Sequence, residues 1–160
     1  MAKPRRKNKD ESGLKRQAKS ASVPKGTARR TLSKARFFLQ QAHLSERRGD
    51  SEAFECYVEA ATIFARSVLG HLRNEFSSLK KENYDKFKKQ LGLHEENPLI
   101  KELIKKRDAF VHGGSKRSIV ALPSDQTDVF YGPLKEDSEK LPDQLQEISA
   151  IIDEFERQFS

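Results

Sequence analysis

The sequence predicts an all-α protein, an antiparallel bundle of four or five helices with a basic tail in front of it. Apolar side chains recur at three- and four-residue spacing through most of the chain after residue 26, which is the period of an amphipathic helix. Residues that start and stop helices separate these runs, as short connections between antiparallel helices require. With 160 residues the chain is long enough for one ordinary domain.

Residues 1–26 form the basic tail. They carry nine Lys or Arg and two acids, a net charge of +7, whereas residues 27–160 are neutral overall. The tail has too few apolar side chains to offset the entropy of ordering, so we predict that it is disordered. It could bind RNA, DNA or another acidic surface through the release of counterions. It could equally serve only to keep the chain in solution, and the sequence leaves both interpretations open.

Residues 27–160 are predicted to form the helical bundle domain, beginning with two long helices. The first spans about residues 28–47 and ends at the break 48–50, where Asp50 is a suitable N-cap for the next helix. The second has the most continuous apolar stripe, from Phe54 to Phe76, and is therefore expected to lie centrally in the bundle. The apolar face of the first helix consists of Leu32, Ala35, Leu39 and Ala42.

Two shorter helices are predicted next. A lysine-rich helix is expected to stop at Gly92. The following helix has Asn97 as N-cap and Pro98 at its first position, a strong start signal, and it is expected to end at Gly113-Gly114. Its predicted apolar face consists of Leu99, Leu103 and Phe110 with the stem of Lys106, and Ile100, Ile104 and Val111 are adjacent to it.

The remainder of the chain combines an insert with a last helix. Residues 115–135 contain two short β-prone runs around Pro123, which predict a β-hairpin or an irregular loop. The last helix is expected to continue to the C-terminus. Its apolar residues are Leu141, Leu145, Ile148, Ile152, Phe155 and Phe159.

The segment RDAFVH, at the end of the predicted fourth helix, carries an arginine, an acid and a histidine. Arg107 and His112 are five positions apart, so on a helix their side chains point about 140° away from each other. Asp108 lies one turn before His112 and could orient its imidazole. The same residues could be only the polar end of a structural helix, because a histidine there interacts favourably with the helix dipole.

This segment resembles the Arg-x(4–6)-His signature of HEPN domains. The run ARFFLQQA…AFECYVEAATIFARSVLGHL is also similar to the paired first helices of several HEPN families, and the resemblance covers about residues 28–158. Two other pairs, Arg36…His43 and Arg66…His71, have an allowed spacing but lie inside predicted helices and fit the signature less well.

The resemblance implies an all-α HEPN-like bundle that forms a homodimer and cleaves RNA without a metal. Arg107 would bind the phosphate, and His112 would act as general base on a ribose 2′-OH or as general acid on the leaving 5′-oxygen, with Asp108 in support. It also implies a role as a toxin or defence component, with a cognate antitoxin such as a nucleotidyltransferase. The alternatives are a non-catalytic helical module that dimerises and binds protein or nucleic acid, or a helical adaptor unrelated to HEPN domains.

Several other classes of protein are not expected. The lone Cys56 excludes an internal disulfide framework and a cysteine-rich metal site. The signatures of phosphate loops, zinc proteases and serine hydrolases are absent, so no metal and no cofactor are expected. The chain has no apolar run long enough for a membrane span and no secretory signal, so a cytoplasmic protein without membrane partners is expected.

Overall fold

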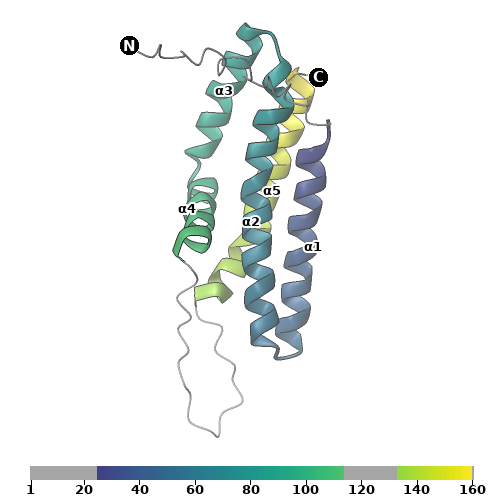
Figure 1. Ribbon diagram of the computed structural model, residues 1–160, viewed down its shortest axis with the longest axis vertical. Helices are drawn as coiled ribbons and strands as arrows, with labels where there is room; N and C mark the ends of the chain where they lie inside the picture. The colour runs from purple at the N-terminus through teal and green to yellow at the C-terminus, as the bar shows by residue number, and fades with distance from the viewer. Residues whose placement is uncertain (1–24, 114–132, 160) are drawn as a thin grey trace, which may run out of the picture.

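The computed structural model describes residues 25–113 and 133–159, and within these ranges the chain is entirely helical, with no strand. In Figure 1, α1, α2 and α5 lie side by side as long rods, and α3 and α4 follow one another along the other side of α2. The prediction of an all-α bundle is therefore confirmed. The helices are α1 (Thr27–Arg47), α2 (Ser51–Glu75), α3 (Lys81–Glu95), α4 (Pro98–Gly113) and α5 (Pro133–Phe159), with a 3-10 turn at Phe76–Ser78.

A tight turn joins α1 to α2 and folds them into an antiparallel hairpin. Gly49 has a φ of 70°, a left-handed conformation that glycine adopts without the steric penalty of a side chain. The carboxylate of Asp50 then accepts a hydrogen bond from Ala53 N at 3.0 Å, as predicted for the N-cap of the second helix. These local signals explain why the sequence locates both ends of this turn.

Helix α2 occupies the centre of the bundle, as its long apolar stripe predicts. It packs extensively against three helices, α1, α4 and α5. By comparison, α1 packs extensively against two, α2 and α5. Residues along its whole length have no solvent exposure. They are Phe54, Val58, Ala61, Ala65, Val68, Leu69 and Leu72.

The sequence predicts that helix α3 stops at Gly92, but the helix continues to Glu95. Two long-range contacts hold this extra turn in place. Arg73 of α2 binds the carboxylate of Glu95 at 2.6 Å, and His94 lies 3.2 Å from a carboxylate oxygen of Glu154 in α5. A glycine inside a helix costs only about 1 kcal/mol relative to alanine, so these tertiary contacts outweigh it.

Helix α4 starts where the sequence predicts, and its buried face is centred on Ile100 and Leu103 rather than on Leu99. The side-chain oxygen of Asn97 accepts a hydrogen bond from Leu99 N at 3.0 Å, and the helix begins at Pro98. Ile100 and Leu103 are fully buried, whereas Leu99 is only partly buried. The side chain of Phe110, the third residue of the predicted face, lies outside the described part of the chain.

Helix α5 begins at Pro133, eight residues before the predicted apolar repeat starts at Leu141. Residues 133–135, assigned to the insert by the sequence pattern, are therefore helical, and the remainder of the insert lies outside the described residues. Pro142 sits within α5, where its ring removes a backbone hydrogen bond and bends a helix. Figure 1 shows the first turns of α5 leading away from α1 and toward the end of α4.

Candidate functional site

The predicted pair lies on one uninterrupted helix. Helix α4 runs through Arg107 and His112 and ends at Gly113, so the expected helical geometry of the RDAFVH segment holds. A rise of about 1.5 Å per residue separates the two positions by about 7.5 Å along the helix axis. The guanidinium of Arg107 is partly buried, and its Nε atom has no contact with solvent. The side chains of Asp108 and His112 lie outside the described part of the chain.

A network of ion pairs fixes α4 against α5 just before this segment. Lys106 Nζ lies 2.8 Å from Glu102 and also pairs with Asp137 of α5, while Lys140 of α5 reaches Glu102 at 3.0 Å. Burial lowers the pKa of Lys106, but the two carboxylates together outweigh burial and raise that pKa. Lys106 therefore stays charged and serves the contact between the helices. These ion pairs fix the position of α4 relative to α5, and therefore the position of Arg107.

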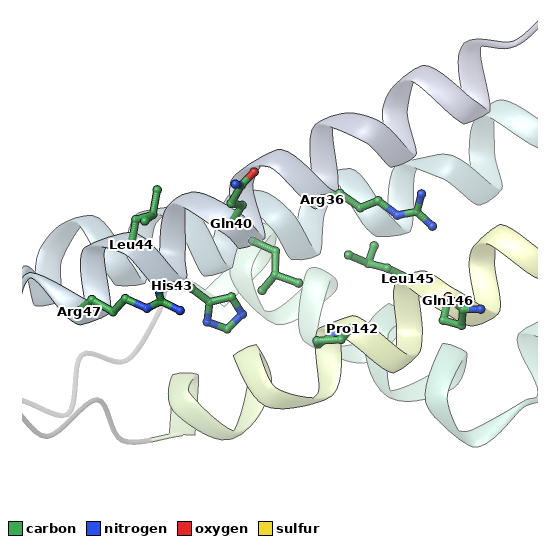
Figure 2. A pocket seen from close by; sticks show the side chains of 9 residues that line it. Arg36, Gln40, His43, Leu44, Arg47, Pro142, Leu145 and Gln146 are labelled. Carbon is green, nitrogen blue, oxygen red and sulfur yellow. The ribbon is translucent and has the colours of Figure 1, made fainter.

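A second site is a groove between α1 and α5, which the sequence does not predict. Its volume is about 500 Å³, and Figure 2 shows its lining side chains. Pro142 lies inside α5 and in the wall of the groove, and because a proline commonly bends a helix, we attribute the groove to this residue. The groove is lined by Arg36, Leu39, Gln40, His43, Leu44 and Arg47 of α1 and by Pro142, Leu145 and Gln146 of α5.

The basic side chains of the groove share one face of α1. Arg36, His43 and Arg47 are separated by seven and four positions, which places them within about 40° of one another around the helix axis. In Figure 2 the ring of His43 points from α1 toward Pro142, and Arg36 extends above Leu145. None of the nine lining residues is acidic. The arrangement is a strip of two arginines and a histidine above an apolar floor.

Glu46 is the acidic residue nearest to this strip along α1, and its charge is already compensated. It pairs with Lys135 of α5, and His43 Nδ1 lies 3.7 Å from its other carboxylate oxygen. The hydrogen bond from Lys135 is the main cause that lowers the pKa of Glu46, with a smaller effect from His43. The pair ties the first turn of α5 to the end of α1, so the groove has a fixed end.

The sequence contains the Arg36…His43 spacing, but its position inside a helix fits the HEPN signature poorly. A separation of seven is two helical turns, so it brings both side chains to one face without any help from tertiary structure. Arg47, one further turn along, extends the same strip. The i, i+7, i+11 pattern of cations was the available signal. Only the course of α5 reveals that this face borders a groove.

The other histidines have packing roles. His94 contacts Glu154 and lies edge-on to Phe155, with ring centroids 5.7 Å apart. Another Arg–His pair of the sequence, Arg66 and His71, is half-buried in the second half of α2. Within the described ranges, no group of three His, Cys, Asp or Glu is placed to hold a metal ion.

Comparison with family models, with curated proteins and with solved structures finds no match to this chain. In the part of the chain that the structure covers, no helix combines the length and apolar character that crossing a membrane requires.

Proposed function

We propose that this chain is a metal-independent endoribonuclease of the HEPN type, with Arg107 and His112 as its catalytic pair and Asp108 in support. The observation that carries the proposal is the course of α4, which continues through the whole RDAFVH segment and ends one residue after His112. A side chain in the last turn of a helix can reach a large substrate, whereas His71, four residues before the end of α2, is half-buried.

The proposed chemistry is transfer within the RNA backbone. One imidazole accepts the proton of a ribose 2′-OH, and the 2′-oxygen attacks the adjacent phosphorus while the bond to the 5′-oxygen breaks. The leaving 5′-oxygen takes a proton, and the new strand end is a 2′,3′-cyclic phosphate. Arg107 binds the phosphate oxygens through its forked N–H groups and stabilises the charge that develops on them.

The angle between the two side chains favours a site built from two chains. Because Arg107 and His112 point about 140° apart on α4, a single helix does not direct both at one phosphate. A two-fold axis beside the helix ends would bring Arg107 of one chain toward His112 of its partner. The toxin or defence role and the cognate antitoxin remain part of this proposal.

The proposal is tested by incubating a mixed-sequence RNA with the full-length protein in EDTA. The wild type should cut the RNA, and His112→Ala should lose cleavage while keeping its helical circular dichroism. Lys105→Ala removes an exposed cation from the same helix, outside the motif, and should retain activity. No cleavage by the wild type, or equal cleavage by His112→Ala, would contradict the assignment.

The groove favours a second candidate function, a non-catalytic binding module. Its cations come from one helix of one chain, so binding there needs neither His112 nor a dimer. RNA binding by a wild type that never cuts RNA would favour this module over the enzyme.

A further inference from the structure

We propose that the groove between α1 and α5 binds the phosphodiester backbone of single-stranded nucleic acid. The proposal goes beyond the cleavage site on α4, and it does not depend on cleavage. It rests on the position of the cations, on the shape of the groove, and on the side chains available for each part of a nucleotide.

The cationic strip matches an extended polyanion better than a single phosphate. Arg36 and Arg47 are eleven positions apart, which is about 16 Å along the helix axis. Both are exposed, and the side chain of His43 between them is 41% exposed. Guanidinium groups form paired hydrogen bonds with phosphate oxygens, so the two arginines can hold separate phosphates of one strand.

The charge of the surrounding helix agrees with this ligand. Helix α1 carries five Lys or Arg and one acid, Glu46, which Lys135 already neutralises. At the opposite end of α1, Arg29 is engaged by Glu156 and Asp153 at 2.8 and 2.7 Å. The positive charge of α1 that borders the groove is therefore that of Arg36 and Arg47, whereas Arg30 and Lys34 lie outside it.

The remaining side chains suit the sugar and base of a nucleotide. Leu39, Pro142 and Leu145 offer an apolar floor, and the amides of Gln40 and Gln146 can donate or accept hydrogen bonds. Phe37, next to Arg36 on α1, is 53% exposed and offers a ring on which a base can stack. A volume of about 500 Å³ is that of a small-molecule pocket, so the groove admits one strand rather than a duplex.

The test measures binding in the background of His112→Ala, so that cleavage cannot affect the result. A fluorescein-labelled ten-residue oligouridylate is titrated with the full-length chain, and its anisotropy is followed at several salt concentrations. The groove variant is Arg36→Gln with Arg47→Gln. The matched control is Arg30→Gln with Lys34→Gln, which removes the same charge from exposed positions of the same helix outside the groove.

We expect the groove variant to bind at least about tenfold more weakly, because it loses two charge-assisted phosphate contacts. The slope of log K against log salt should fall in magnitude by about 1.4, since each phosphate contact on a single strand contributes about 0.7. The control should change affinity less than about twofold. The basic residues 1–26 are present in every variant and add the same background.

Equal weakening by the groove and control variants would overturn the proposal, because binding would then follow the total charge. Displacement of the oligouridylate by poly-L-glutamate at equal charge concentration would identify the groove as a site for acidic peptides instead. If the groove variant fails to fold, Gln146→Glu tests the same site from α5 by adding a negative charge to the opposite wall. Undiminished binding by that variant would also contradict the proposal.

Discussion

Two arginine–histidine pairs, on α1 and on α4, contain the same residue types, yet helical geometry separates their roles. Arg36 and His43 are seven positions apart and share a face, so one chain completes the cationic strip. Arg107 and His112 are five positions apart and diverge by about 140°, so a joint site needs a second chain. The spacings differ by only two positions. Because of this difference, one chain can form the site on α1, whereas the site on α4 is expected to need a dimer.

The surroundings of the two pairs differ in a second way. The α1 pair borders a groove whose opposite wall on α5 includes Pro142. The α4 segment follows an ion-pair network in which Lys106 contacts Glu102 and Asp137. The first turns of α5 contact both regions. Lys135 of α5 pairs with Glu46 of α1, and Asp137 of α5 pairs with Lys106 of α4. A change at the start of α5 is therefore the most direct way to affect both sites at once.

The largest expected effect separates the two histidines by their kinetics. His112→Ala should lower kcat for RNA cleavage by about 10²- to 10⁴-fold, because it removes the proton-transfer group. His43→Ala should act mainly on KM, since His43 belongs to the proposed binding groove. Steady-state cleavage rates over a range of RNA concentrations measure both. A larger loss of kcat in His43→Ala than in His112→Ala would move the chemistry to the groove.

Mixing two inactive variants tests whether the α4 site is shared between chains. Arg107→Ala and His112→Ala are each expected to be inactive, but a mixed dimer would contain one intact combination of Arg107 and His112. After random reassociation of a two-fold dimer, about a quarter of the wild-type cleavage should return. The cleavage rate of the equimolar mixture is the measurement. No recovery, although subunit exchange is demonstrated with labelled chains, would place both residues within one chain.

Pro142→Ala tests the origin of the groove. The substitution restores an N–H that can bond the carbonyl of the fully buried Ser138, one turn earlier in α5. Because a proline in a helix interior costs about 3 kcal/mol relative to alanine, we expect the free energy of unfolding to rise by about 1–3 kcal/mol. Oligouridylate affinity should fall as α5 straightens toward α1. Urea unfolding and anisotropy provide the two readings, and unchanged affinity would show that the bend does not create the binding site.

A smaller effect is expected at the start of α4. Asn97→Ala removes the cap on Leu99 N and a contact with Glu147 at 3.1 Å, so the free energy of unfolding should fall by about 1 kcal/mol. Cleavage should decline more than oligouridylate binding, because only the α4 site depends on this helix. Asp50→Ala removes the corresponding cap from α2 and should cost a similar amount. Equal losses of cleavage in both variants would contradict a specific link between Asn97 and the α4 site.

The smallest expected effect concerns the Glu46–Lys135 contact that links the two regions. Lys135 lowers the pKa of Glu46 in the folded protein. The contact therefore stabilises the fold at any pH above 4.5, the ordinary pKa of a glutamate. That stabilisation is lost as the pH falls through the lower folded-state pKa. Glu46→Gln should therefore reduce the free energy of unfolding by less than about 1 kcal/mol at pH 7, and the reduction should be smaller at pH 2. Urea unfolding of both proteins at the two pH values tests this, and an equal difference at both would rule out a charge effect.

The sequence located most helix boundaries because their signals are local. Asp50 and Asn97 bond to backbone N–H groups two or three residues away, and Gly49 supplies the one conformation the turn needs. The sequence pattern did not locate a helix boundary where residues far apart in the chain determine it. The last turn of α3 depends on Arg73 and Glu154, which no short window of sequence around Gly92 contains.

The sequence by itself determined that the chain is helical, that α2 is central, and that each Arg–His pair has its particular angle. All three follow from the period of the helix, which a linear pattern reveals directly. Packing between the helices decided that Leu99 of α4 is only partly buried, that α5 starts at Pro133, and that Arg36 borders a groove. These features depend on which helix faces which, and that arrangement is set by packing between residues far apart in the chain.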